Sequence, residues 1–174
     1  MINALSSIAR SRTFWFLVLL ACVVLEGTAL YYQYILDYGP CVLCVHIRAW
    51  IFGLGAVALL MMIFGGPLAF LGHLASLALG VGLLRSSYIT LGVEQGTIID
   101  SCTMDPEFPD WLPLHQWSPT LFEPWEPCGY TPELAFNVTM AEALMVISAI
   151  WVLVSFILFF ASFRKPRRDR GLFL

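Results

Sequence analysis

The chain has 174 residues, of which 59% are hydrophobic and only 12% are charged. Soluble globular proteins carry about 25% charged residues, so this composition excludes an ordinary soluble enzyme or binding domain. The length suits one domain, and the apolar residues fall in long uncharged runs, which is typical of an integral membrane protein. We therefore expect membrane lipid around the chain and no nucleic acid partner.

The apolar runs predict an all-α membrane protein, a four-transmembrane-helix bundle that forms a single integral membrane domain over residues 1–174. A helix needs about 20 residues to cross a bilayer, because each residue adds about 1.5 Å. The predicted spans are residues 14–34, 43–64, 68–91 and 140–163. No small-residue cleavage site follows the first run, so we expect no cleavable signal peptide. Thr139 and Glu142 have the spacing of a capping box at the start of the last span.

The basic residues predict the orientation of the spans. The segment 92–138 has no Lys or Arg and has eight acidic residues. Basic residues gather before the first span and after the last: Arg10, Arg12, Arg164, Lys165, Arg167, Arg168 and Arg170. Since cytoplasmic segments are enriched in Lys and Arg, both termini are predicted to be cytoplasmic. The loops at residues 35–42 and 92–138 are then predicted to face outward.

The long outward loop cannot be one continuous helix, because it holds seven of the ten prolines. It also contains Trp111, Trp117, Phe122 and Trp125. Amphipathic aromatic side chains suit the headgroup region of a bilayer. We therefore expect residues 108–122 to lie along the membrane surface and to include a short interfacial helix. The alternative is a loop whose aromatic residues pack into a small core of their own.

Cys41 and Cys44 form a CxxC motif directly after Pro40, where the second predicted span begins. A helix N-terminus offers unpaired N–H groups and a positive dipole end, and both stabilise a thiolate, the reactive form of cysteine. The motif therefore predicts a redox site at the boundary between water and membrane. Haem attachment would need His directly after the second Cys, but position 45 is Val. Zinc would need a second closely spaced pair, so no metal is expected.

Cys102 and Cys128 lie on the long loop, with 25 residues between them. Taken alone, this pair is compatible with a static structural disulfide. Together with the CxxC motif it favours a redox relay, because a jointed loop can carry one sulfur to another for direct attack. Cys22 is different, because it lies in the first span about 18 Å below the outer end at 1.5 Å per residue. We expect Cys22 to be a buried apolar residue.

Three ionisable residues fall inside the predicted spans, where charge is costly: Glu26, Arg48 and Arg85. Arg48 follows Cys44 by four residues, so both side chains lie on one face of the helix. There Arg48 can stabilise a Cys44 thiolate or donate hydrogen bonds to a carbonyl group. The alternative for Arg48 is a side chain that reaches the nearby interface. We expect Glu26 to form a structural ion pair with Arg85 or Arg48.

In this combination the chain resembles the bacterial disulfide bond formation protein B (DsbB) family over nearly its whole length. The resemblance rests on the four spans, Glu26, the CxxC motif with Arg48, the second cysteine pair, the stretch 108–114 with Trp117, and the basic tail. It implies a protein-dithiol:quinone oxidoreductase in the bacterial inner membrane. Such a protein reoxidises a periplasmic DsbA-like thiol oxidase and passes the electrons to ubiquinone or menaquinone.

The resemblance also implies roles for individual residues. The redox-active disulfides would be Cys41–Cys44 and Cys102–Cys128. The DsbA-like partner would attack Cys102, and Cys128 would then pair transiently with Cys41. Cys44 would lie next to the quinone, with Arg48 at the quinone ring.

The chain departs from the family pattern near the outer end of the third span. Members of the best-known type carry a His there, which assists the quinone. Here the sequence ends that stretch with Glu94 and Gln95. Glu94 or Gln95 therefore lies nearest to the position that the His has in the family. Gln95 is the residue predicted to contact the quinone in its place.

Two other functions stay open from the sequence. One is a thiol oxidase dedicated to a single periplasmic substrate system, for example a sulfotransferase. The other is a non-catalytic membrane subunit with two structural disulfides. A relative of vitamin K epoxide reductase is disfavoured, because its CxxC motif would sit in the last span rather than open the second.

Overall fold

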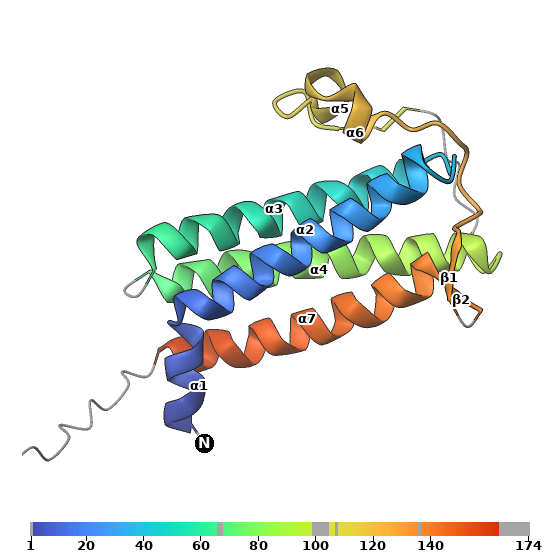
Figure 1. Cartoon of the computed structure of the whole chain (residues 1–174). Coiled ribbons are helices and arrows are strands. Elements are labelled where there is room, and N and C mark those ends of the chain that lie inside the picture. The colour runs from blue at the N-terminus through green and yellow to red at the C-terminus, as the bar shows by residue number, and fades with distance from the viewer. Residues whose placement is uncertain (1, 66–67, 99–104, 107, 136, 164–174) are drawn as a thin grey trace, which may run out of the picture.

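Four long helices dominate the computed structural model, which describes residues 2–65, 68–98, 105–106, 108–135 and 137–163. They are α2 (Arg12–Tyr34), α3 (Val42–Phe64), α4 (Ala69–Glu94) and α7 (Met140–Ser162) (Figure 1). Each is long and apolar enough to cross a bilayer. The predicted four-helix membrane fold is confirmed.

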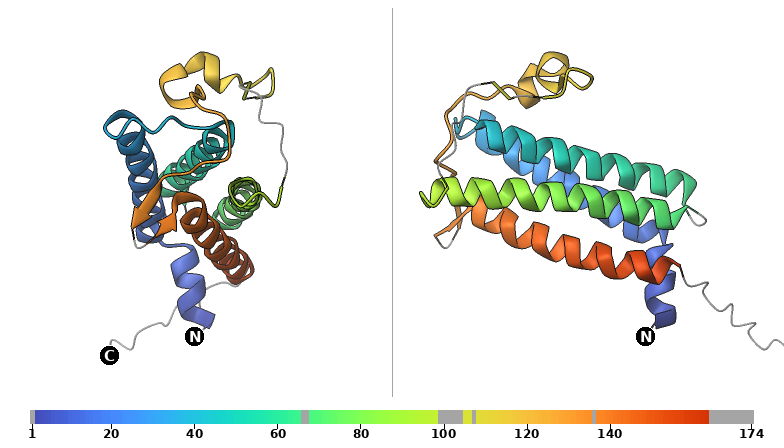
Figure 2. Two further views of the ribbon diagram at one scale, coloured as in Figure 1. Left: turned by 90° about the vertical axis from the view of Figure 1, so that its right-hand side faces the viewer. Right: turned by 180° about the vertical axis from the view of Figure 1, so that it is seen from behind.

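The helices alternate in direction and lie side by side, as Figure 2 shows end-on. The C-termini of α2 and α4 therefore lie at the same end of the bundle as the N-termini of α3 and α7 (Figure 1). We call this the outer end, because the long loop leaves and re-enters the bundle there. The buried core includes Trp15, Ile51, Leu54, Ala58 and Leu83.

The outside of the bundle is apolar and its inside contains small polar residues, the reverse of a soluble protein. Exposed side chains include Val23, Leu60 and Leu153, which suit contact with hydrocarbon. Between α4 and α7, the buried hydroxyl groups of Ser76 and Ser155 lie 3.4 Å apart. Small residues at such an interface let two helices approach closely, which is how membrane helices associate.

A short helix that the sequence analysis did not predict precedes the first span. This helix, α1 (Ile2–Ala9), lies beside the end of α7, opposite the outer end (Figure 1). Two hydrogen bonds fix the junction: Arg10 Nη2 donates to the Ser162 carbonyl at 2.9 Å, and His73 Nε2 donates to the Ala9 carbonyl at 2.9 Å. Both donors satisfy carbonyl groups at helix ends, which have no partner within their own helix.

The capping box predicted at the start of α7 is confirmed. The Glu142 backbone N–H donates to Thr139 Oγ1 at 3.3 Å, and the Thr139 N–H donates to Glu142 Oε2 at 3.0 Å. A small hairpin, which was not predicted, leads into this cap. Its strands are β1 (Glu133–Ala135) and β2 (Val138–Thr139).

The long loop carries two short helices where one was predicted. They are α5 (Leu114–Trp117) and α6 (Pro119–Phe122), and they meet at Ser118, whose extended φ of −146° ends the first. The pair does not cover the outer end of the bundle. It lies against the flank of α3 (Figures 1 and 2), where the rings of Phe52 and Phe122 are 5.5 Å apart. The placement of residues 108–122 along a membrane surface stays a prediction.

Close packing between α4 and α7 depends on Gly80. A Cβ atom at this position would lie 2.8 Å from Cδ1 of Trp151, which is too close for a rigid ring. We expect Gly80→Ala to destabilise the bundle by about 1–3 kcal/mol, the usual cost of overpacking. The measurement is the thermal unfolding midpoint in detergent.

Gly55→Ala is the matched control for this prediction. It is also inside a helix, but its Cβ would make only an ordinary contact of 3.6 Å with Cys22. An unfolding midpoint that falls equally in both variants would contradict the packing argument.

Candidate functional site

The CxxC motif begins α3 at the outer end of the bundle. Cys41 is the N-cap residue, with φ −80° and ψ 167°, and its Sγ accepts the backbone N–H of Cys44 at 3.2 Å. The two cysteines form a disulfide across Cα atoms 5.0 Å apart. Pro40 lies one residue before the N-cap. The expected position of the motif at a helix N-terminus is confirmed.

A segment of the long loop runs beside the chain that enters this motif. The Trp125 N–H donates to the Pro40 carbonyl at 2.9 Å, and Cys41 and Glu126 form an isolated parallel bridge. Gly39 makes this approach possible, since a Cβ there would lie 2.8 Å from Glu126 Cγ. The loop backbone is therefore docked directly against the redox motif.

Cys128 is close in sequence to this point of contact. Cys128 follows Glu126 by two residues and is half-buried. Cys102 lies outside the described residues, so the Cys102–Cys128 pairing stays a prediction. The transient Cys41–Cys128 disulfide also stays a prediction.

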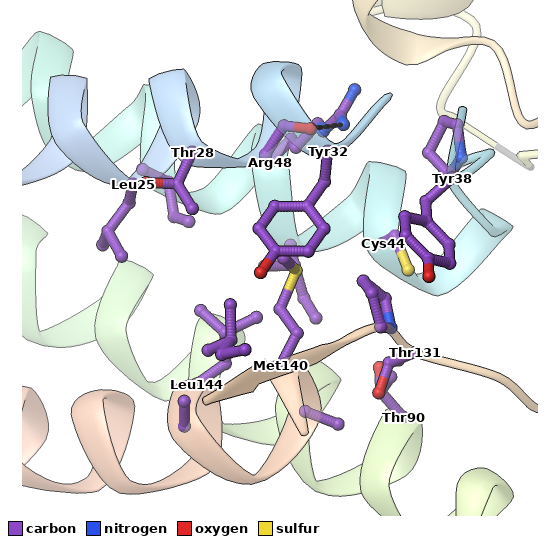
Figure 3. A pocket seen from close by; sticks show the side chains of 18 of the residues that line it. Leu25, Thr28, Tyr32, Tyr38, Cys44, Arg48, Thr90, Thr131, Met140 and Leu144 are labelled. Carbon is purple, nitrogen blue, oxygen red and sulfur yellow. Dashed lines mark hydrogen bonds between the residues drawn. The ribbon is translucent and has the colours of Figure 1, made fainter. Parts of the chain in front are cut away.

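A cavity of about 110 Å³ lies next to the CxxC motif, between α2, α3, α7 and the segment before β1. Its walls are mostly apolar. Figure 3 shows Cys44 and Tyr38 at one end of the cavity, and Leu25 and Leu144 at the other. The ring centroids of Tyr38 and Tyr130 are 6.2 Å apart at the outer mouth, and Tyr38 raises the pKa of the Tyr130 phenol.

Arg48 lies in the wall of this cavity and is buried. Only 5% of the residue is exposed. Its Nη1 donates to Gln33 Oε1 at 2.6 Å and to the Leu121 carbonyl at 3.1 Å, and its Nη2 donates to the Ala29 carbonyl at 3.3 Å. Arg48 thus joins α2, α3 and α6. These three bonds occupy three of about five N–H donors of a guanidinium group.

The sequence analysis missed Gln33, the closest partner of Arg48. This side chain is 1% exposed, and its Nε2 donates to the Thr120 carbonyl at 3.5 Å. The signal was available, because an amide in an otherwise apolar helix needs a hydrogen-bond partner. Gln33 lies one residue before the end of α2.

The ion pair expected for Glu26 is not formed as a direct contact among the described residues, although the charges of Glu26 and Arg48 lie close enough to attract each other. Glu26 is 8% exposed, and neither of its carboxyl oxygens has a hydrogen-bond partner. Arg48 donates to an amide and two carbonyl groups, and Arg85 is exposed on α4. The expectation was wrong because neutral oxygens on α2 and α6 already satisfy Arg48. Glu26 instead lines the cavity.

Glu94, rather than Gln95, contacts residues of the site. Its Oε2 accepts the hydroxyl groups of Thr131 at 2.8 Å and Thr139 at 3.3 Å. Since Thr131 also lines the cavity, Glu94 ties the end of α4 to the cavity wall. Gln95 is exposed and is not among the lining residues.

Two further residues complete the surroundings of the site. Cys22 is a free, buried cysteine in the core, as expected. His46, which the sequence did not single out, anchors the other side of the loop. Its Nε2 donates to the Pro106 carbonyl at 2.6 Å, and its ring lies 5.2 Å from that of Phe108.

Comparison with known proteins agrees with this arrangement. The family model described as "Disulfide bond formation protein DsbB" matches residues 11–158. A disulfide bond formation protein B from Haemophilus influenzae (strain 86-028NP) is 37% identical over 182 residues, which cover 99% of each chain. One from Shewanella loihica is 32% identical over 170 residues, which cover 95% of this chain and 98% of the relative. The chain therefore belongs to the DsbB family and is a membrane oxidoreductase that forms disulfide bonds.

Proposed function

We propose that this protein reoxidises a periplasmic DsbA-like dithiol oxidase and passes the electrons to a membrane quinone, either ubiquinone or menaquinone. One observation carries the proposal: the Cys41–Cys44 disulfide lies between a docked loop on one side and an apolar cavity on the other. Electrons can enter through the loop and leave through the cavity.

The entry side is a sequence of thiol–disulfide exchanges. A thiolate of the partner attacks Cys102, and Cys128 leaves as a thiolate. Cys128 then attacks Cys41, and Cys44 leaves as a thiolate. The partner's second thiolate resolves the mixed disulfide at Cys102, so the partner leaves oxidised. Cys102 then attacks Cys128, which restores the Cys102–Cys128 disulfide and releases Cys41, so Cys41 and Cys44 are left as the reduced pair. Two electrons have then moved to this chain, and each sulfur bond broken is matched by one formed.

The local structure supports Cys44 as the leaving sulfur. Cys44 lies in the first turn of α3, where the positive end of the helix dipole stabilises a thiolate. Its backbone N–H already points at Cys41 Sγ. Cys44 is also the member of the pair that lines the cavity, so its sulfur faces the apolar side.

The residues around the cavity fit a quinone. When bound, a quinone accepts two electrons and two protons. The apolar walls from α2, α3 and α7 suit its ring and tail, and Arg48 keeps N–H donors beyond its three hydrogen bonds. The carboxyl oxygens of Glu26 have no hydrogen-bond partner in the part of the chain that the structure describes, which supports a polar ligand group there.

The charge distribution supports a location in the bacterial inner membrane with both termini in the cytoplasm. The long loop, with its acids and its lack of Lys and Arg, leaves the outer end of the bundle. Arg10 lies at the opposite end, bonded to the last turn of α7. This separation is the one expected when basic residues stay in the cytoplasm.

A dedicated oxidase for one substrate system is the second candidate, since the same relay would serve it. A non-catalytic subunit with two structural disulfides is disfavoured by the cavity beside Cys44, which a purely structural disulfide does not need.

Quinone reduction and partner trapping test the relay directly. The purified protein should reduce a short-chain quinone only when a reduced DsbA-like dithiol is present. A partner that lacks its resolving cysteine should form a covalent complex through Cys102, which is lost in Cys102→Ser. Mass spectrometry should detect a Cys41–Cys128 crosslink during turnover. A complex that forms through Cys41 at full rate in Cys102→Ser would mean that the loop pair is structural.

Arg48→His should weaken quinone binding more than partner exchange. Loss of a charge-assisted hydrogen bond costs about 1.5–3 kcal/mol, so we expect the apparent quinone KM to rise about ten-fold or more. Steady-state kinetics with varied quinone and varied partner separate the two effects. Arg85→His, on the exposed face of α4, should leave both constants unchanged. Lost partner exchange with normal quinone kinetics would refute the role.

Gly39→Ala should slow electron transfer from the loop to the CxxC motif. The new Cβ would lie 2.8 Å from Glu126 Cγ and 3.0 Å from Trp125 Cβ, so the docked segment must move. A displacement of about 1 Å can cost about 100-fold in rate, and we expect a loss of about ten- to 100-fold. Stopped-flow measurement of Cys41–Cys44 reduction by the partner checks this. Gly27→Ala, with no atom within 4 Å of its Cβ, should behave like the unmodified protein.

A further inference from the structure

Glu26 is a buried carboxyl group with no hydrogen-bond partner among the described residues, and it lies in the wall of the cavity that Cys44 also lines. It is 8% exposed, and both of its oxygens are buried and lack hydrogen bonds. Leaving a carboxyl group in this condition is expensive, because its lost hydration is not replaced. A group retained at such cost calls for an explanation other than packing.

The polar neighbours of Glu26 in the cavity wall do not supply that explanation. Thr28 Oγ1 donates to the Val24 carbonyl at 2.8 Å, and Thr90 Oγ1 donates to the Ser86 carbonyl at 2.8 Å. Arg48 is committed to Gln33, Leu121 and Ala29, as described above. None of these hydrogen bonds goes to Glu26, so among the described residues its carboxyl oxygens have no donor and line the cavity unbonded.

Glu26 also lies at the deep end of the cavity. It precedes Tyr34, the end of α2, by eight residues, or about 12 Å at 1.5 Å per residue. Cys44, by contrast, lies in the first turn of α3. Figure 3 shows Leu25 and Thr28, which flank Glu26 in sequence, at the end away from Cys44. A ligand that fills the cavity therefore meets sulfur at its shallow end and the carboxyl group at its deep end.

We propose that Glu26 holds a proton at its carboxyl oxygen and donates it to the quinone oxygen at the deep end of the cavity. This role rests on the proposed function. Oxidation of the Cys41–Cys44 dithiol to the disulfide releases two electrons and two protons, and the quinone takes up two of each. Glu26 supplies one of the protons, becomes a carboxylate, and regains a proton from the outer aqueous phase.

The surroundings support this cycle. Arg48, one turn further out, carries the positive charge that stabilises the carboxylate while it lasts. The cavity reaches the exposed Tyr38 at its mouth, which gives protons a route from water. The titratable groups that line the cavity are Glu26, Tyr32, Tyr38, Cys44, Arg48 and Tyr130. Among them, Glu26 is the only carboxyl group, and α4 and α7 contribute no titratable side chain to the lining.

Glu26→Gln tests the proposal, because glutamine keeps the shape and can donate a hydrogen bond but has no proton to transfer. Quinone reduction by the reduced protein should slow by about 10²–10⁴-fold, the usual contribution of a general acid. Reduction of the Cys41–Cys44 disulfide by the soluble partner should not change. Glu123→Gln makes the same chemical change at an exposed position outside this cavity and should not alter either rate.

Two readouts separate proton transfer from a structural role. Infrared difference spectra should show a carboxyl C=O band that shifts when quinone binds and is missing in Glu26→Gln. The plot of quinone-reduction rate against pH should lose one of its limbs in the same variant. Quinone binding, measured by tryptophan fluorescence, should stay similar. If Glu26→Gln does not fold, Glu26→Asp serves instead. It should keep the carboxyl band and retain part of the normal rate of quinone reduction.

The outcomes distinguish this inference from the proposed function. If the unmodified protein reduces no quinone, the proposed function fails and the role of Glu26 fails with it. The variant compared is Glu26→Gln, or Glu26→Asp where Glu26→Gln does not fold. If the unmodified protein reduces quinone but shows no quinone-sensitive carboxyl band, and the variant reduces quinone at the normal rate, only the role of Glu26 is overturned.

Discussion

A buried guanidinium group holds the outer end of this bundle together. Arg48 is almost fully removed from solvent, and a charge in that position is tolerable only when hydrogen bonds replace its hydration. Its partners come from α2 and from α6, more than 70 residues further along the chain. The long loop is therefore fixed to the membrane helices by the same side chain that lines the cavity beside Cys44. The wall of the cavity beside Cys44 and the position of the loop therefore depend on one set of contacts.

This arrangement gives the CxxC motif two different sides. On the loop side, the Pro40 carbonyl and the Cys41 backbone pair with the segment at Trp125 and Glu126. On the membrane side, Cys44 faces an apolar cavity. A helix N-terminus suits the junction, because its unpaired N–H groups can stabilise sulfur without any additional cation. The Cys41–Cys44 disulfide thus lies between the loop segment and the cavity.

Much of this protein can be read from its sequence. The four spans follow from hydropathy, since a backbone in hydrocarbon must satisfy its own hydrogen bonds and forms helices. The helix start at the CxxC motif and the capping box at Thr139 are local patterns of a few residues, and both are confirmed. The burial of Cys22 follows from its depth in the first span. Each of these features depends only on neighbours in the chain.

The tertiary structure decided the rest, because it depends on contacts between distant segments. Pairing charges by type suggested an ion pair for Glu26, but Arg48 found amide and carbonyl acceptors on α2 and α6 instead. Glu94, rather than Gln95, contacts the site because its carboxylate accepts hydrogen bonds from Thr131 and Thr139. Only the folded chain brings these two residues to the end of α4. The position of α6 against the flank of α3 has no local signal either. Prolines predict where a helix ends, but they do not predict the direction of the chain that follows.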